Sequence, residues 1–344
     1  IKFKSMSIFF FFLIHVAINI FIYFNFDKIS KIINMYDVPD HNRKLHKLPV
    51  SNIGGLIIFF NIILIAFLFL IKKNLLSDTL YFHSQFQFIS FFIFTIPFII
   101  IGVLDDKVHL SANVKMTLLT VVLIFVLYID KDLRIYELRM TFLESGIQLN
   151  NFTIVFTLFS ILLFINALNM MDGINLLVGM YSLSIFLFFI FYLNVNLIFI
   201  FMIIGLINYL ILNYHNKVFL GDNGTILLAY TISYFFIKSY NYEGFIYADQ
   251  IFLIMMIPGL DMLRVAVIRI FSGISPFKAD RAHLHHLFSD AYNHKVALTY
   301  ILLMSTVPTL INLLIIKETL LIIILVFFIY TISVISLNRK IKYH

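Results

Sequence analysis

The chain has 344 residues, of which 61% are hydrophobic and only 12% are charged, and its mean hydropathy is +0.98. This composition excludes an ordinary soluble domain and predicts an all-α polytopic integral membrane protein, because each span needs about 20 mostly apolar residues. The formal net charge is +7, and the basic residues lie in short loops between apolar runs. That placement indicates membrane topology and argues against a nucleic-acid partner. Cysteine is absent, which excludes disulfide and thiolate chemistry.

The apolar runs predict about 11 transmembrane helices (10–11) in a single domain covering residues 1–344. The first run lacks a small-residue cleavage site, so we expect a retained span and no signal peptide. The expected spans are 7–26, 53–71, 86–104, 114–129, 153–169, 176–193, 195–213, 226–238, 249–268, 297–315 and 318–337. Residues 131–152 are polar with some alternation, which predicts a small β-hairpin outside the bilayer, on the periplasmic side.

The loops between these spans differ in charge. Loops 27–52, 105–113, 170–175, 214–225 and 269–296 lie on one predicted side, together with the C-terminus. This side carries most of the 25 Lys and Arg residues. The positive-inside rule therefore makes it the cytoplasmic side.

Five polar clusters fall on that same predicted side. They are "YDVPDHNRKLHKLPVSNIGG" (36–55), "DDKVHLSANVK" (105–115), "NALNMMDGIN" (166–175), "KVFLGDNGT" (217–225) and "DRAHLHHLF" (280–288). Ionisable groups at membrane depth are costly and indicate function by default. Their convergence on one face predicts a site at the membrane surface.

Acidic and basic side chains in these clusters suit phosphoryl transfer. The acids are Asp105, Asp106, Asp172 and Asp222, and the bases include Arg43, Lys44, Arg281 and the histidines. Carboxylates brought together repel one another unless a cation lies among them, and hard oxygen ligands favour Mg²⁺. Basic side chains donate to phosphate oxygens. The set predicts an acid–metal–base arrangement, in which catalysis is mainly positioning and charge neutralisation.

Each motif also has a structural interpretation when taken alone. An aspartate pair at a helix end is more often a cap, and "MDG" and "GDNG" are common turn sequences. Asp261 and Arg264 are three residues apart and could simply pair on one helix face. "HLHH" could bind zinc, but the chain has no cysteine and no HExxH motif. The order of the motifs and their shared face favour function.

Taken together, the motifs resemble those of the polyprenyl-phosphate N-acetylhexosamine-1-phosphate transferases, glycosyltransferase family 4. The resemblance extends from Asp37 to about Leu287, and the motifs stand in the family's order. "LRVAVIRIFSGISPFKADRAHLHHLF" is similar to the histidine loop of the WecA/TagO-like branch. The acidic stretch that follows the histidines in the MraY branch is not found.

The resemblance implies transfer of an N-acetylhexosamine-1-phosphate from a UDP-sugar to undecaprenyl (polyprenyl) phosphate, with release of UMP. The product is the lipid-linked pyrophosphoryl sugar that begins a cell-surface glycan, such as O-antigen or teichoic acid. It further implies Mg²⁺, with Mn²⁺ as an alternative, a multi-pass protein of the bacterial inner membrane with its active site on the cytoplasmic face, and a homodimer.

The resemblance also assigns residues. The implied catalytic residues are Asp105, Asp106, Asp172 and His283, with Asp105 closest to the lipid phosphate and Asp106 supporting it. The implied metal ligands are Asp222 and Asp172. The implied substrate-binding residues are Arg43, Lys44, His46, Asn169, Asn175, Asn213, Arg281, His285 and His286.

Some positions depart from the family pattern. Asn175 is followed by Leu176, where the family usually has glycine, and Ala279 stands where proline is usual. These departures predict a divergent branch of the family and leave the choice of sugar open. None of them removes a candidate acid.

Three other hypotheses remain at this point. A muramyl-pentapeptide transferase of the MraY type is the nearest enzyme alternative. An ion-coupled transporter would place its carboxylates near the bilayer midplane within repeats, whereas these acids fall at span ends and no repeat is evident. A non-catalytic scaffold is disfavoured because all four candidate acids are present.

Overall fold

The computed structural model describes residues 2–39, 48–71, 85–192, 197–243, 246–276 and 280–342. The chain divides into two compact units. The first unit comprises Ile1–Leu118 and Ser182–Thr231, and the second comprises Leu119–Tyr181 and Ile232–His344.

Long apolar helices dominate the described residues. Six are long and apolar enough to cross a membrane: α4 (Gln85–Val108), α5 (Ala112–Ile129), α6 (Thr153–Met171), α10 (Ala248–Phe271), α12 (His294–Leu314) and α13 (Thr319–Lys342). A seventh span results if the bent pair α1 (Lys2–Phe24) and α2 (Phe26–Ile33) counts as one. The predicted multi-pass architecture is confirmed at this level, and the count of 11 spans stays a prediction.

Further helices are shorter or less apolar. They are α3 (Gly54–Ile71), α7 (Leu177–Tyr192), α8 (Leu197–Tyr214) and α9 (Gly221–Glu243). We predicted a short span over 226–238 in place of α9, but α9 extends over 23 residues. Its middle is almost entirely buried, so its polar residues face protein.

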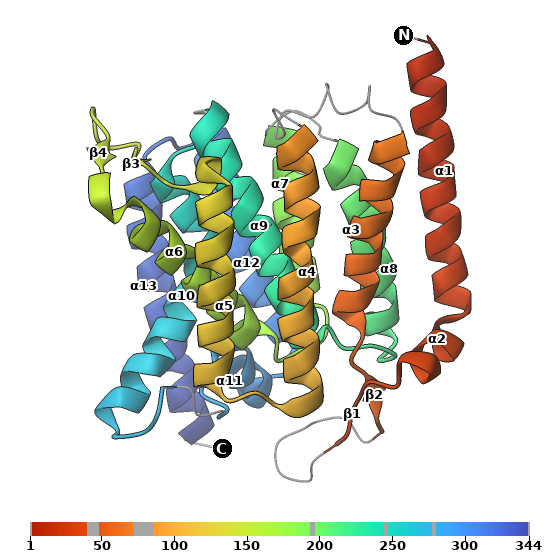
Figure 1. Cartoon of the computed structure of the whole chain (residues 1–344). Helices are drawn as coiled ribbons and strands as arrows, with labels where there is room; N and C mark the ends of the chain where they lie inside the picture. Colours follow the sequence, from red (N-terminus) through yellow and green to blue (C-terminus); the bar gives the residue numbers. More distant parts are fainter. Residues whose placement is uncertain are drawn as a thin grey trace. The chain divides into compact units, whose positions relative to one another are not determined.

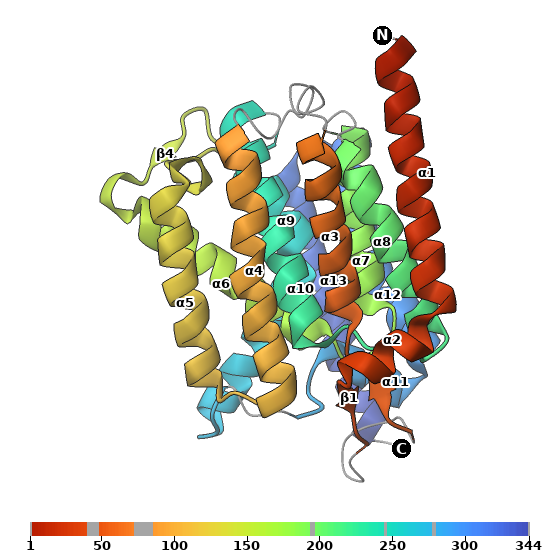
Figure 2. The same ribbon diagram turned by 45° about the vertical axis from the view of Figure 1, so that its right-hand side comes forward.

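In the first unit, α3 packs against α8, as Figure 2 shows, and α1 also contacts α8. The axis of α2 turns by 73° from that of α1 (Figure 1). Buried amides join the three packed helices, because Asn208 Nδ2 donates to Asn19 Oδ1 (3.0 Å) and Asn19 Nδ2 donates to Asn61 Oδ1 (2.7 Å). Such interhelical hydrogen bonds stabilise helix association in membranes.

A short antiparallel pair precedes α3. Strand β1 (Tyr36–Asp37) pairs with β2 (Val50–Ser51), with Tyr36 opposite Ser51. The backbone N–H of Gly54 then donates to the carbonyl of Phe219 (3.0 Å). This contact places the start of α3 beside the segment that leads into α9.

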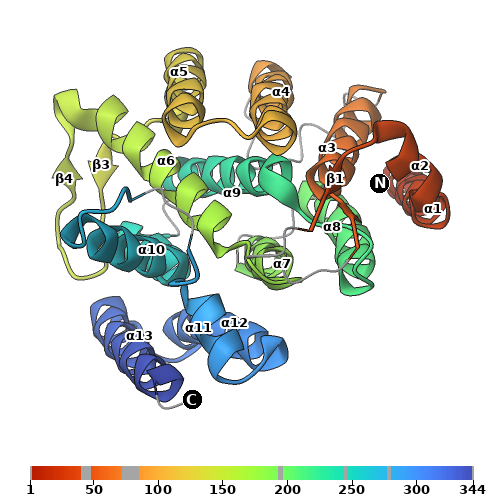
Figure 3. The ribbon, with the colours of Figure 1, turned by 90° about the horizontal axis from the view of Figure 1, so that it is seen from below.

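In the second unit, α10 packs against α6, α12 and α13, while α11 (Leu284–Ala291) packs against α12 and α13 (Figure 3). The predicted hairpin is confirmed, since β3 (Glu137–Leu138) and β4 (Ile147–Gln148) form an antiparallel pair. Short 3₁₀ turns, η2 (Lys131–Leu133) and η3 (Asn150–Phe152), flank it. The N–H of Thr141 donates to Asp249 Oδ1 (3.1 Å), which fastens the hairpin to the N-terminal end of α10.

Candidate active site

The first cluster is built around Lys115, in the first turn of α5. Its Nζ lies 2.5 Å from Oδ2 of Asp105, near the end of α4, and 3.2 Å from Oδ1 of Asp222, in the first turn of α9. Two carboxylates that would otherwise repel each other therefore share one cation. The Asp222 side chain is 27% exposed and that of Asp105 only 6%, so Asp222 is the more accessible acid.

Asp106 has a different environment from its neighbour Asp105. Its carboxylate accepts hydrogen bonds from the backbone N–H groups of Asp222 (3.0 Å) and Asn223 (2.9 Å) and from Nδ2 of Asn52 (2.7 Å). The first N–H groups of a helix have no partner within the helix, and a carboxylate there also interacts favourably with the helix dipole. Asp106 thus caps α9 from another helix and fixes the backbone of Asp222.

Gly221 makes this cap sterically feasible. Its φ is +71°, and a Cβ there would lie 2.5 Å from Oδ1 of Asn52 and 2.8 Å from Oδ2 of Asp106. Only glycine adopts this conformation at little cost and leaves room for both neighbours. The glycine of "GDNG" is therefore needed for the position of Asp222.

In the second unit, the turn after α6 meets the histidine segment. A Cβ on Gly173 would lie 1.9 Å from Nε2 of His285, so the imidazole lies directly against this turn. Asp172 follows the last residue of α6, and its N–H donates to the carbonyl of Asn169 (3.2 Å). The "MDGIN" and "HLHH" motifs, more than 100 residues apart in sequence, are therefore adjacent.

The same turn contains one of the departures from the family pattern, Leu176 in place of glycine. Leu176 has a φ of +71°, in the left-handed region where glycine is favoured. A leucine therefore occupies a backbone conformation that glycine adopts more readily. Asn175 lies in the same turn, immediately before this residue.

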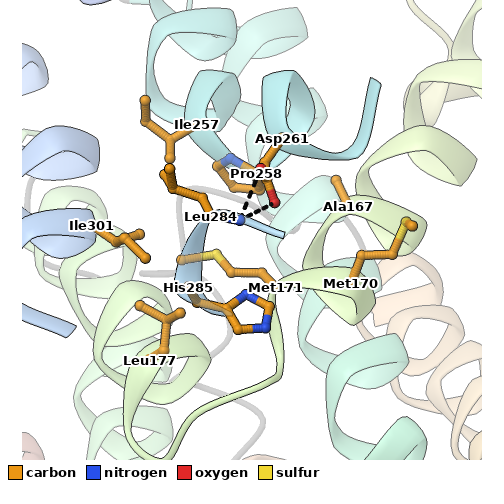
Figure 4. Close-up of a pocket in the computed structure, with 10 residues that line it drawn as sticks. All are labelled: Ala167, Met170, Met171, Leu177, Ile257, Pro258, Asp261, Leu284, His285 and Ile301. Carbon is orange, nitrogen blue, oxygen red and sulfur yellow. Dashed lines mark hydrogen bonds between the residues drawn. The ribbon is translucent and has the colours of Figure 1, made fainter. Parts of the chain in front are cut away.

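Asp261 of α10 holds the start of the histidine segment. Its Oδ2 lies 2.9 Å from Nδ1 of His283, and both of its oxygens accept from the N–H of Leu284 at 3.1 Å (Figure 4). Arg264 Nη2 donates to Asp261 Oδ1 (2.7 Å), as predicted, and also to the carbonyl of Ala282 (2.6 Å). Asp261 and Arg264 therefore pair on one face of α10 and also hold the distant segment from Ala282 to Leu284.

A small cavity of about 10 Å³ lies beside these groups, lined by Asp261, His285 and apolar side chains that include Met171 and Ile301 (Figure 4). That volume holds about one water molecule. Nε2 of His285 is buried, and no hydrogen-bonding partner for it occurs in the described part of the chain. A water in the cavity would satisfy such an atom.

Burial sets the charge of the histidines. Burial, followed by the positive charge of Arg281, lowers the pKa of His286 to about 4. Burial and the neighbouring His286 lower the pKa of His285 well below its usual value. Both rings are therefore neutral near pH 7 and can accept or donate through hydrogen bonds without carrying charge.

Two further ion pairs shape the histidine loop. Arg281 Nη2 lies 2.5 Å from Oδ1 of Asp290, and Arg269 Nη2 lies 2.9 Å from Oδ1 of Asp280. The hydrogen bonds from Arg269 lower the pKa of Asp280. Arg281 is about one-third exposed, so its guanidinium is accessible to an anionic ligand.

The predicted residues thus gather in two groups. Asp105, Asp106 and Asp222 lie together in the first unit, while Gly173 of the third motif and His285 of the fifth lie together in the second. Asn213, predicted to bind substrate, donates through Nδ2 to the carbonyl of Val218 (2.6 Å) and is buried. Arg43, Lys44 and His46 lie outside the described residues.

Sequence reasoning missed Lys115, Asn52 and the contact of Asp261 with His283. Lys115 was used only to assign a membrane side, although a lone cation at the start of an apolar span close to an acid pair is a usable signal. Within the described ranges, no group of three or more His, Asp or Glu side chains is arranged to share a metal ion. A metal would thus need ligands from substrate or solvent as well.

Sequence comparisons relate this chain to known proteins. The family model of glycosyl transferase family 4 matches residues 88–240, a range that contains Asp105, Lys115 and Asp222. The predicted family resemblance is thereby confirmed. The chain is 28% identical over 276 residues to undecaprenyl-phosphate alpha-N-acetylglucosaminyl 1-phosphate transferases of Salmonella typhi and Escherichia coli (strain K12). Each alignment covers 77% of this chain and 71% of the relative.

A relative from Bacillus subtilis (strain 168) is 27% identical over 289 residues, covering 80% of this chain and 76% of its own length. It is named a probable undecaprenyl-phosphate N-acetylglucosaminyl 1-phosphate transferase. The similarity to these named transferases thus extends well beyond the residues 88–240 that the family model matches.

Proposed function

We propose that this chain transfers an N-acetylhexosamine-1-phosphate from a UDP-sugar to undecaprenyl phosphate. A phosphate oxygen of the lipid attacks the β-phosphorus of the UDP-sugar. The bond from that phosphorus to the bridging oxygen breaks, and UMP leaves with that oxygen. The lipid then carries a sugar through a diphosphate.

The observation that carries the proposal is the Lys115 bridge. An ammonium held between Asp105 and Asp222, at the ends of three helices, is a local charge arrangement that a purely structural helix end does not need. The names of the relatives support the substrate class, since each acts on undecaprenyl phosphate. Phosphoryl transfer relies chiefly on positioning and charge neutralisation, which is what such a cluster provides.

Mg²⁺ fits the donor set of this cluster, with Mn²⁺ as an alternative. Asp222 and Asp105 offer hard carboxylate oxygens that already hold a cation, and Mg²⁺ is usually bound by one or two carboxylates plus substrate phosphates. When bound, the metal would neutralise charge on the diphosphate. Asp222 would be the first ligand, because it is the more exposed, and Asp172 is a second candidate.

The chain's own residues would do the rest of the work. Lys115 would donate to a phosphate oxygen and hold Asp105 and Asp222 in place. Asp106 would act through the backbone, by fixing the start of α9. Arg281 and His283 would bind the diphosphate or sugar, and Asn169 and Asn175 would lie near the nucleotide.

The setting of the reaction follows from the same proposal. UDP-sugars are cytoplasmic, so the site would face the cytoplasm in the bacterial inner membrane, in agreement with the loop charges. The product would begin a cell-surface glycan such as O-antigen or teichoic acid. A homodimer remains part of the proposal on family resemblance alone.

The test is UMP release by purified protein in detergent with undecaprenyl phosphate, Mg²⁺ and a panel of UDP-N-acetylhexosamines. The proposal predicts release that requires both lipid and metal, and the best donor identifies the sugar. Asp222→Asn and Asp105→Asn should abolish it while the protein still inserts. Full activity in either variant would contradict the site, and no release by folded wild-type protein with any donor would contradict the function.

A further inference from the structure

The carboxylate of Asp261 in α10 contacts several segments of the second unit. It accepts hydrogen bonds from Arg264, Tyr330 and the N–H of Leu284, and it contacts Nδ1 of His283. Asp261 is only 7% exposed. The contacts with Tyr330, Leu284 and His283 do not follow from a simple pair with Arg264 on one helix face.

We propose that Asp261 is a positioning residue that holds His283 with its proton on Nδ1, so that Nε2 is the atom presented to the diphosphate. The role given to Nε2, which is to bind the diphosphate, rests on the proposed function. The position of the proton on the ring does not depend on that function.

The first step concerns the proton. A carboxylate only accepts hydrogen bonds, and a separation of 2.9 Å between Oδ2 and Nδ1 is a hydrogen bond. The proton in this contact therefore belongs to Nδ1. A neutral imidazole then carries its lone pair on Nε2, the ring nitrogen that does not face Asp261.

The second step concerns the backbone. Asp261 accepts from the N–H of Leu284, and Arg264 donates to the carbonyl of Ala282. Ala282 and Leu284 flank His283 in the sequence, so residues of α10 hold the peptide groups on both sides of this histidine. The orientation of the ring is thus set by backbone and side chain together, which is what a substrate-facing group requires.

The third step concerns the neighbours of the ring. His283 stacks on His285, with ring centroids 5.8 Å apart and planes 1° from parallel. His285 in turn lies against the turn at Gly173. A rotation of His283 would disturb both contacts, so Asp261 also holds the histidine segment against the turn that follows Asp172.

A purely structural role is the alternative. Tyr330 of α13 donates to Asp261 Oδ1 (3.0 Å), so the carboxylate could serve only to join α10 to α13. The two roles differ in what they do to His283. A structural carboxylate would affect stability alone, whereas a positioning carboxylate sets the tautomer and acts through His283.

The first test reads the tautomer in the wild-type protein by ¹⁵N NMR of histidine-labelled protein, with the His283 signal assigned from its loss in His283→Gln. We expect the Nδ1–H form for His283. In Asp261→Asn the amide can donate to Nδ1, so the signal should move to the Nε2–H form. An Nε2–H form in the wild-type protein would overturn the proposal, even if the variant failed to fold or the protein released no UMP.

The second test is a double-mutant cycle on UMP release. Asp261→Asn should lower kcat about 100-fold with a small change in KM, since positioned proton-sharing groups contribute about that factor or more. The double variant with His283→Gln should be no slower than His283→Gln alone, because Asp261 acts through that ring. Independent, multiplying effects would overturn the proposal.

Asp249→Asn is the matched control. Asp249 is also buried, belongs to the same helix and accepts from the Thr141 N–H, but it is 12 residues from Asp261 and contacts the hairpin. We expect it to change the melting temperature and leave kcat and the His283 signal as they are. An equal loss of kcat in this variant would assign the effect to helix stability and contradict the positioning role.

Discussion

Lys115 and Asp222 are separated by 107 residues in the sequence, and Nζ of one lies 3.2 Å from Oδ1 of the other. Asp105 completes the contact from α4 at 2.5 Å. The ends of α4, α5 and α9 therefore meet at a single shared charge. This cluster, together with the cap that Asp106 places on α9, defines the candidate site of the first unit.

Replacing Lys115 by methionine keeps most of the side-chain volume and removes the cation. The two carboxylates then repel each other, and we expect turnover to fall at least about 100-fold, as when other preorganised charges are removed. Steady-state UMP release measures this. Lys217→Met is the control, because its pair with Asp27 is 3.7 Å long and exposed. Comparable losses in the two variants would contradict the special role of Lys115.

Gly221→Ala tests the cap on α9. The added Cβ would meet Asn52 and Asp106 at a backbone φ of +71°, so we expect a loss of about 1–3 kcal/mol in stability, with activity lost as well. Gly259→Ala is the matched control in a helix, since a Cβ there meets nothing within 4 Å. It should raise the melting temperature slightly. Thermal unfolding compares the two, and a stable, active Gly221→Ala protein would refute the cap.

Leu176→Gly should stabilise the protein. A non-glycine residue in the left-handed region costs about 1–2 kcal/mol, and glycine relieves that strain. Leu176→Ala removes the side chain and keeps the strain, so the difference between the two variants isolates the backbone term. We expect the glycine variant to melt higher than the alanine variant. The reverse order would show that the turn is not strained.

The histidine segment should make stability depend on pH. The pKa of His286 is about 4 in the folded chain against 6.5 for an unperturbed ring, so the unfolded chain takes up a proton first as pH falls. Stability should therefore be fully present above about pH 6.5 and decline towards about pH 4. Melting curves at several pH values measure the decline, which should be shallower in His286→Gln. An unchanged slope in that variant would contradict the assignment.

Much of the fold follows from hydropathy. The long helices α4, α5, α10, α12 and α13 lie close to the predicted spans, because a span of about 20 apolar residues leaves little choice in a bilayer. The hairpin at 131–152 was also predicted from its alternation. Helix α9 was predicted too short because polar residues at its ends, among them Asn223 and Ser239, are buried against protein, and hydropathy alone treats such residues as solvent-facing.

The candidate site was only partly predictable. The motifs indicated which acids matter, but their partners come from other helices and depend on tertiary packing. Asp261 and Arg264 were expected to pair three residues apart, and they do. Asp261 also contacts His283 and Arg264 also contacts Ala282, each about 20 residues further along the chain. Hydrophobic periodicity relates only positions close in sequence, so it does not predict these contacts. Leu176 is similar, since its positive φ cannot be read from a leucine in a sequence.

The most direct test of the central claim identifies the leaving nucleotide and the mass of the lipid product in one reaction. Purified protein, undecaprenyl phosphate, Mg²⁺ and the preferred UDP-sugar would be analysed by mass spectrometry. Sugar-1-phosphate transfer predicts UMP and a lipid that has gained both a sugar and a phosphate. Release of UDP, with a lipid that has gained the sugar alone, would contradict the account.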